Sequence, residues 1–297
     1  MPLRLLVAKV SCQFRMQSRG DLMLCMDKKN LQYYEALWSE IKQKENPQQF
    51  WDKRAAHFNQ PTQTKRNRLT ETVDFLKSIG LKKNDMVLDI GCATGKLAMQ
   101  LQKYVHSIHG IDISPKMIAY AVENAQKGQY TNLTYETAIW ADIDLYKKKW
   151  EKHFDWVIAS MTPGVYNFHT LKKMNEASRK HCFLSTIVNR KNDWLEQLHH
   201  KFSFIRPQTE FKNGTYCIFN LLWLMGYMPE VRYIESVYTN QWTIEEAEDM
   251  LWLGELPQEK RQAVQMDLKR NAKDGRIFET VHTHIAFIHW RVDQHLV

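Results

Sequence analysis

Cysteine and long apolar runs are both scarce in this sequence of 297 residues. Its five cysteines are an odd number and include no C-x-x-C pair, which argues against a disulfide framework and against a zinc knuckle. The longest apolar run, residues 216–228, contains Asn220 and is well short of the roughly 20 residues that cross a bilayer. The stretch LRLLVAKVSC is too short, and too interrupted by Lys9, for a secretory signal. These absences predict a cytoplasmic protein without a membrane span.

The net positive charge is also small once residues 1–25 are set aside. The formal net charge is +8, but residues 1–25 carry +3 of it, which leaves +5 for the other 272 residues. The only short basic runs, residues 65–68 and 147–149, are of the kind that usually forms a solvated surface. The sequence therefore gives a weak electrostatic indication of a nucleic-acid partner.

The chain divides into an amino-terminal part and a larger domain. Residues 1–25 differ in character from the rest of the chain, so we expect a disordered or mis-annotated leader, with Met26 or a nearby methionine as the natural start. Residues 26–70 show helical spacing of apolar residues, with a break at Asn46-Pro47, and predict a helical cap. Residues 71–297 are expected to form the main domain, and a helix over 65–80, closed by Gly80, runs across its beginning.

Apolar strands alternate with helices through the first part of that domain. Strands are expected over 86–90, 107–112, 133–137, 154–160 and 181–188, with helices over 96–104, 114–126 and 171–180 between them. This alternation predicts an α/β fold with a doubly wound, mostly parallel sheet. Residues 189–275 are less regular and predict helices around a strand at 231–242, inserted before a final strand at 279–292. We expect this insertion to form a helical lid over the ligand site.

The turn after the first strand reads Asp89-Ile90-Gly91-Cys92-Ala93-Thr94-Gly95. A dinucleotide fingerprint would need glycines at 91, 93 and 96, and two of these positions are Ala93 and Lys96. The stretch instead resembles motif I of the class I S-adenosylmethionine-dependent methyltransferases, D/E-x-G-x-G-x-G, with alanine at the middle glycine. The resemblance covers roughly residues 50–188, is closest to the bacterial small-molecule type, and implies a Rossmann-like fold with S-adenosyl-L-methionine as cofactor.

The resemblance also implies roles for individual residues. Gly91 and Gly95 would let the backbone approach the cofactor without a Cβ in the way, and Asp89 would meet the methionine ammonium. Asp112, at the end of the second strand, would accept hydrogen bonds from the ribose hydroxyls, while Ile113 packs on the adenine. The expected cofactor-binding residues are Asp89, Gly91, Cys92, Ala93, Gly95, Asp112, Ile113, Trp140, Ala141 and Ser160.

The third cofactor element is open between two interpretations. The family often has an acid just after the third strand, whereas here Asp142 lies about three positions further along. Either Asp142 reaches the adenine from a shifted loop, or the backbone around Trp140 makes the contact and the indole covers the ring. In the helix before the domain, Trp51, Arg54 and Phe58 are equally open between closing over the cofactor and packing on the surface.

Residues for the chemistry itself are less clearly indicated. Tyr166 and His169 follow the fourth strand, on the loop that would border the transferable methyl, and are the candidate catalytic residues. His282 and His284 share one face of the last strand, but without a recognisable third ligand they predict no metal site. An aromatic set could either cap a planar acceptor or pack against the sheet; it comprises Tyr216, Phe219, Trp223, Tyr227, Tyr233, Tyr238 and Trp242.

The leading interpretation is an S-adenosylmethionine-dependent methyltransferase that acts on a small or medium-sized acceptor beneath the lid. One alternative is an RNA or tRNA methyltransferase, which would need a basic face and stacking aromatic residues. Another is a non-catalytic S-adenosylmethionine-binding regulatory protein. The acceptor and the oligomeric state stay open at this point.

Overall fold

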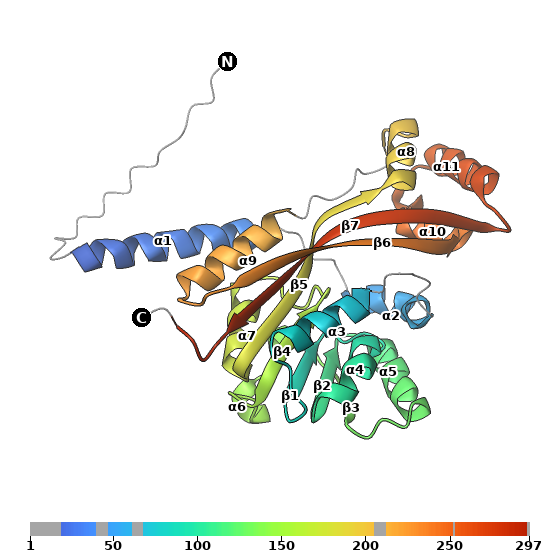
Figure 1. Ribbon diagram of the computed structural model, residues 1–297. Coiled ribbons are helices and arrows are strands. Elements are labelled where there is room, and N and C mark those ends of the chain that lie inside the picture. Colours follow the sequence, from blue (N-terminus) through green and yellow to red (C-terminus); the bar gives the residue numbers. More distant parts are fainter. Residues whose placement is uncertain (1–18, 40–46, 61–67, 205–211, 252, 296–297) are drawn as a thin grey trace, which may run out of the picture.

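The computed structural model describes residues 19–39, 47–60, 68–204, 212–251 and 253–295. Within these ranges the chain forms a seven-stranded sheet with helices on both faces (Figure 1). The strands are β1 (Met86–Ile90), β2 (Ser107–Asp112), β3 (Leu133–Thr137), β4 (Phe154–Ser160), β5 (Ser178–Asn192), β6 (Glu230–Thr243) and β7 (Arg276–Arg291).

The strands follow the order β3-β2-β1-β4-β5-β7-β6. The first five strands of the chain pair in parallel, and β7 runs antiparallel to both of its neighbours. The chain changes direction across the sheet between β1 and β4, and doubly wound sheets bind ligands at such a point, outside the carboxyl ends of the strands. The predicted doubly wound, mostly parallel sheet is confirmed.

Helices cover the two faces of this sheet and bury an apolar layer on each. On one side α3, α4 and α5 pack through residues such as Leu76, Leu97 and Ala125. On the other side α7, α9 and α1 contribute residues such as Met174 and Leu221. The helices outside the insertion are α1 (Arg19–Ser39), α2 (Pro47–Asn59), α3 (Arg68–Ser78), α4 (Lys96–Leu101), α5 (Pro115–Lys127), α6 (Leu145–Lys148) and α7 (Phe168–Ala177), with 3-10 turns η1 (Gln102–Tyr104) and η2 (Trp140–Asp142).

Several helix boundaries have clear local causes. The Ser114 hydroxyl accepts a hydrogen bond from the Met117 amide, and Pro115 occupies the first helical position, so α5 begins where the sequence predicts. Gly80 closes α3 with a φ of +110°, a left-handed conformation that glycine adopts without strain. Asn167 forms a capping box with Thr170 at the start of α7.

Strands β5, β6 and β7 continue past the carboxyl edge of the parallel sheet. The last residue of β4, Ser160, pairs with Ser185, and beyond it β5 has only β7 as a partner. We define the ribbon as residues 186–192, 233–243 and 276–286. Its β6–β7 pairing is continuous, and its β5–β7 pairing has one register shift, between Ile187 and Asn189. In Figure 1 the ribbon rises from the sheet and carries a group of helices at its far end.

Those helices form a small lobe with an apolar core of its own. The lobe contains α8 (Asp193–Lys201), α10 (Ile244–Met250), η3 (Leu253–Glu255) and α11 (Gln258–Asn271), whereas α9 (Lys212–Leu224) lies beside α1 on the main body (Figure 1). Its core includes Ala247, Val264, Leu268 and Ile277. The inserted segment is thus anchored by its own packing at the end of a sheet extension, rather than by a loop alone.

Several expected boundaries differ from the structure. Residues 178–180 begin β5, so the helix predicted over 171–180 instead spans Phe168–Ala177. The predicted insertion at 189–275 begins later than expected, because β5 continues to Asn192. Helix α1 begins at Arg19 rather than at Met26, while residues 1–18 of the expected leader lie outside the described residues.

No helix in the described ranges is long and apolar enough to span a bilayer.

Candidate active site

The turn between β1 and α4 has three alternate residues in the left-handed region. Gly91, Ala93 and Gly95 have φ values of +68°, +49° and +77°. A Cβ added at Gly91 would lie 1.9 Å from the Oγ1 of Thr162, and one at Gly95 would lie 2.6 Å from the hydroxyl oxygen of Tyr135. The turn therefore needs glycine at 91 and 95 both for its backbone conformation and for the side chains that pack directly against it.

Two carboxylates lie beneath this turn. Asp112 ends β2 and accepts hydrogen bonds from the backbone amides of Ala93, at 3.0 Å, and Ser114, at 2.9 Å. Asp89 lies in β1, is 3 % exposed, and its Oδ2 has no hydrogen-bond partner among the described residues. Burial and the nearby charge of Asp112 raise the pKa of Asp89 to about 7. Burial also raises the pKa of Asp112, against the opposing effect of its two amide donors.

This pair suits a ligand that combines a cation with hydroxyl groups. An unpartnered buried carboxylate is costly unless a positive group or a donor reaches it, and the ammonium of S-adenosylmethionine supplies both. Each oxygen of Asp112 already accepts one amide hydrogen bond, and a carboxylate has about four lone-pair positions, so two remain for two ribose hydroxyls. Asp89 and Asp112 therefore fit the two roles that the resemblance implies.

Other predicted cofactor residues border the same turn. Cys92 is buried, its thiol donates to the carbonyl of Ala93, and burial raises the pKa of that thiol. Ile113 and Ala141 are half-buried and leave part of their surface free for a ligand. Ser160, at the end of β4, lies with its hydroxyl 3.2 Å from that of Ser185. The structure thus groups Cys92, Ala93 and Ile113 around the two acids, with Ser160 at the next strand end.

Trp140 lies elsewhere than the sequence suggests. Its side chain is buried in the core between the sheet and α7, and its indole nitrogen donates to the carbonyl of Thr170 at 3.0 Å. The ammonium of Lys173 donates to the carbonyl oxygens of Trp140, Ala141 and Ile143. The indole therefore packs in the core and does not cover an adenine, which leaves only the backbone at this position for a cofactor contact. Asp142, the other candidate, is exposed.

Helix α2 closes over the turn and the start of α5. Ser114 donates from its hydroxyl to Asp52, and Asn124 donates both to Asn59 and to the carbonyl of Thr94. The ammonium of Lys96, the first residue of α4, donates to the carbonyl of Gln60. These contacts fix α2 above the cofactor end of the sheet. Asp52 and Asn59 are not predicted from the sequence, because nothing in their spacing shows that α2 faces α5.

The three candidate residues of α2, Trp51, Arg54 and Phe58, contact other side chains of α2 or are partly exposed. Trp51 packs edge-on against Phe50 and Phe58, and the guanidinium of Arg54 lies 3.7 Å from the centre of the Phe50 ring. Phe58 is 40 % exposed. The contact from α2 to the ribbon is made instead by His57, whose ring stacks on that of Trp242 in β6 with the ring centres 4.4 Å apart.

The loop after β4 lies directly beside the glycine turn. The Thr162 side chain fills the space next to Gly91, and its hydroxyl accepts a hydrogen bond from the amide of Gly164. Tyr166 follows in the same loop and is half-buried, whereas His169 is exposed in the first turn of α7. Tyr166 is thus the better placed of the two candidate catalytic residues.

The structure does not bring the seven predicted aromatic residues together. Tyr216, Trp223 and Tyr233 are each at least half exposed, whereas Tyr227 is buried against the main body. Tyr238 and Trp242 occupy even positions of β6 and so face the opposite side of that strand from Tyr233. A single aromatic cap is therefore not formed, and Phe219 stacks on Trp223 within α9 instead.

No cluster of three or more potential metal ligands occurs in the described ranges. His282 and His284 both lie on the exposed side of β7, and His284 is 3.3 Å from a carboxylate oxygen of Glu235. Their neighbourhood on this surface is that of an ordinary exposed sheet pair.

Comparisons with known proteins agree with this geometry. Residues 81–221 match a family model described as a methyltransferase domain. A solved S-adenosylmethionine-dependent methyltransferase from Aquifex aeolicus has the same fold, with a TM-score of 0.51 at 13% identity over 81% of this chain and 98% of its own. The chain belongs to the class I S-adenosylmethionine-dependent methyltransferase superfamily. The cofactor of this superfamily is S-adenosyl-L-methionine, as predicted.

Two curated relatives show how far the similarity extends. A putative methyltransferase of Invertebrate iridescent virus 6 is 25% identical over 185 residues, which are 58% of this chain and 60% of the viral protein. An uncharacterized protein of Haemophilus influenzae is 24% identical over 253 residues, which are 82% of this chain and 89% of that protein. The second match is longer than the span of residues 81–221, so the similarity to the Haemophilus influenzae protein extends beyond the matched methyltransferase domain.

Proposed function

We propose that this methyltransferase acts on a small or medium-sized acceptor, which binds between the ribbon and the carboxyl edge of the parallel sheet. The observation that carries this proposal is the unpartnered, buried carboxylate of Asp89 beside Asp112, at the point where the strand order reverses. The ribbon and α2, which meet through Trp242 and His57, lie over this edge.

The main role of the chain's residues would be to bind the cofactor and to position the acceptor. When bound, S-adenosylmethionine supplies a methyl group on a positively charged sulfur. Asp89 would hold the ammonium end of the cofactor and Asp112 the ribose, while the loop from Thr162 to Tyr166 borders the place where the acceptor must approach. Holding a nucleophile in line with the methyl provides much of the rate enhancement of such a displacement. Tyr166 would orient the acceptor or accept a proton from it.

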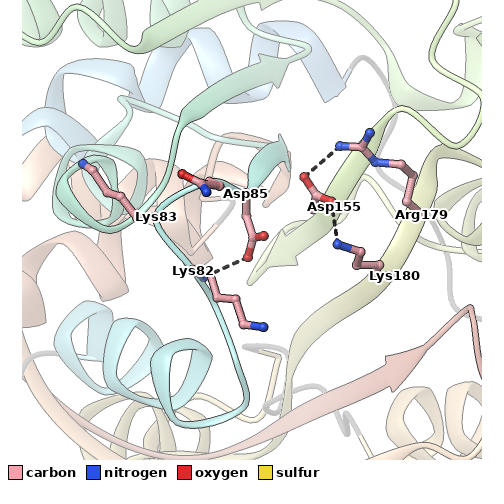
Figure 2. A pocket seen from close by; sticks show the side chains of 7 residues that line it. Lys82, Lys83, Asp85, Asp155, Arg179 and Lys180 are labelled. Carbon is pink, nitrogen blue, oxygen red and sulfur yellow. Dashed lines mark hydrogen bonds and ion pairs between the residues drawn. The ribbon is translucent and has the colours of Figure 1, made fainter.

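The RNA alternative has little support from the surface. One cavity of about 590 Å³ is lined by Lys82, Lys83, Arg179 and Lys180, together with Asn84, Asp85 and Asp155 (Figure 2). It opens at the amino edge of the sheet, where β1, β4 and β5 begin, which is the edge opposite the glycine turn. Figure 2 also shows Arg179 and Lys180 directed at Asp155, at 2.8 Å and 3.3 Å. Nucleic acid bound there would lie far from the transferred methyl.

The test is methyl transfer from methyl-labelled S-adenosylmethionine into separated cell fractions. We expect S-adenosylhomocysteine to accumulate with a fraction of small molecules and the label to enter that fraction. The Asp112→Ala variant is the matched control and should lose most of this turnover. Label that entered only bulk tRNA would establish the RNA alternative. Intact binding of S-adenosylhomocysteine without turnover in any fraction would instead indicate a regulatory protein.

A further inference from the structure

One face of the ribbon is buried although much of it is polar. In β7 the odd positions Glu279, Val281 and Thr283 are buried, while the even positions between them are exposed. Asn192 of β5 and Asn240 of β6 both donate to the carboxylate of Glu279, at 2.5 Å and 2.6 Å. These three side chains therefore share one face, which is turned toward the main body.

Arg190 belongs to this inner face. It lies two residues before Asn192 in a regularly paired part of β5, opposite Thr283, so its side chain is on the same side of the strand. Its Nε is buried and has no hydrogen-bond partner among the described residues. From Ser185, at the sheet edge, to Arg190 the strand rises roughly 15 Å. Arg190 therefore stands well above the cofactor turn.

Arg68 approaches the same face from below. It is the first residue of α3, whose Phe75 packs against Phe287 of β7 and lies beneath the guanidinium of Arg232. Because α3 runs from the carboxyl edge toward the amino edge of the sheet, its first residue is the end nearest the ribbon. The Nε of Arg68 is likewise buried without a partner among the described residues. Tyr238, on the inner face, is close enough to influence the pKa of Arg68.

The other buried charge on this face does not neutralise these guanidinium groups. Each oxygen of Glu279 already accepts a hydrogen bond from an asparagine, and within the described ranges no ion pair joins Glu279 to either arginine. Lys96 adds a third positive charge beside Arg68, and burial together with the charge of Arg68 lowers the pKa of Lys96. A buried guanidinium Nε without an acceptor is unfavourable unless an anion or another acceptor reaches it.

We infer that Arg68 and Arg190 bind an anionic group of the methyl acceptor, either a carboxylate or a phosphate, between the ribbon and α3. Both groups present the oxygen pairs that guanidinium donors match. This inference rests on the proposed function, because it places the anion at the acceptor side of the cofactor. It assigns the acceptor to the class of small organic anions, whose charged end is held away from the reacting atom.

The first experiment uses the full chain with saturating S-adenosylhomocysteine, so that the carboxylate of the cofactor is already in place. Inorganic phosphate and succinate are titrated at constant ionic strength, and the melting temperature is followed. We expect at least one of them to give a saturable rise, and the one that does identifies the kind of anion. Arg190→Gln and Arg68→Gln should each raise the half-saturating concentration by about tenfold or more, the effect of losing a charge-assisted hydrogen bond.

Matched variants distinguish specific anion binding from a general effect of the protein's charge and from misfolding. Arg179→Gln, at the opposite edge of the sheet and paired with Asp155, should respond like the unchanged protein. Arg190→Lys, which keeps the charge, should retain part of the response. A response that is equal in Arg190→Gln and the unchanged protein would overturn the inference. A response that disappears when S-adenosylhomocysteine is bound would also overturn it, since the arginines would then serve the cofactor carboxylate.

The second experiment follows the labelled product from the small-molecule fraction on an anion-exchange column. The inference predicts a product that is retained, because the bound anion is not the atom that is methylated. A labelled product that is neutral or cationic would refute the inference while leaving methyl transfer established. If S-adenosylhomocysteine itself failed to bind, the proposed function would fail first, and the two failures are therefore distinguishable.

Discussion

Asp89 makes the cofactor site sensitive to pH in a way that can be measured. Burial raises its pKa to about 7, and only the ionised carboxylate attracts an ammonium group. At pH 6 about one in eleven such groups is ionised and at pH 8 about ten in eleven. We therefore expect the affinity for S-adenosylhomocysteine to rise by up to about tenfold between these two pH values.

The folding stability of the ligand-free protein should change with pH in the opposite direction to the cofactor affinity. Because the pKa of Asp89 is higher in the folded chain than its ordinary value of 3.8, the folded state binds more protons than the unfolded state between these values. The contribution of Asp89 to stability is therefore fully present below pH 3.8 and is lost as the pH rises through about 7. The loss is on the order of a few kcal/mol. Cofactor affinity and ligand-free stability should thus move in opposite directions over this range.

Calorimetry at pH 6 and pH 8, in two buffers of different ionisation enthalpy, tests the affinity and counts the protons released on binding. Asp89→Asn should bind more weakly and lose most of the pH dependence; the raised pKa of Asp112 leaves a smaller slope of the same sign. Glu123→Gln, on the exposed side of α5, is the matched control and should behave like the unchanged protein. Equal affinity at both pH values without proton release would refute the role given to Asp89.

The cofactor half of the molecule follows closely from the sequence. Strands β1 to β4 begin and end at the predicted residues, because each is a short strand-like segment between helices and turn residues. The helix cap at Ser114 and the close at Gly80 are likewise local. Asp89 and Asp112 are predicted from the resemblance to the methyltransferase family, and their carboxylates lie at one edge because strand ends in a parallel sheet meet there.

The acceptor half is harder to predict from the sequence, because its features depend on long-range packing. Residues 189–192 resemble a polar loop, yet they extend β5 because β7 pairs with them far beyond the main sheet. Trp140 is predicted near the adenine but packs in the core, where Thr170 offers a carbonyl to its indole. Nothing local indicates that Glu279 is buried or that Arg190 has a buried Nε, because both are residue types that are mostly exposed.

Three substitutions test the remaining contacts. Asp112→Ala should weaken S-adenosylhomocysteine binding by about 1.5 to 3 kcal/mol, the usual value of charge-assisted hydrogen bonds; unchanged affinity in calorimetry would contradict its role. Gly91→Ala should lower the free energy of unfolding in urea by roughly 1 to 3 kcal/mol, because its Cβ collides with Thr162 and its φ is +68°. Asn240→Leu removes the donor that reaches the Oε1 of Glu279, a side chain that is 1 % exposed. The amide of Asn192 contacts the other oxygen, Oε2, so Oε1 loses its asparagine donor in a buried position. We expect a loss of about 1 to 3 kcal/mol in urea unfolding, and an unchanged midpoint would show that water satisfies Glu279 and that the inner face of the ribbon is open.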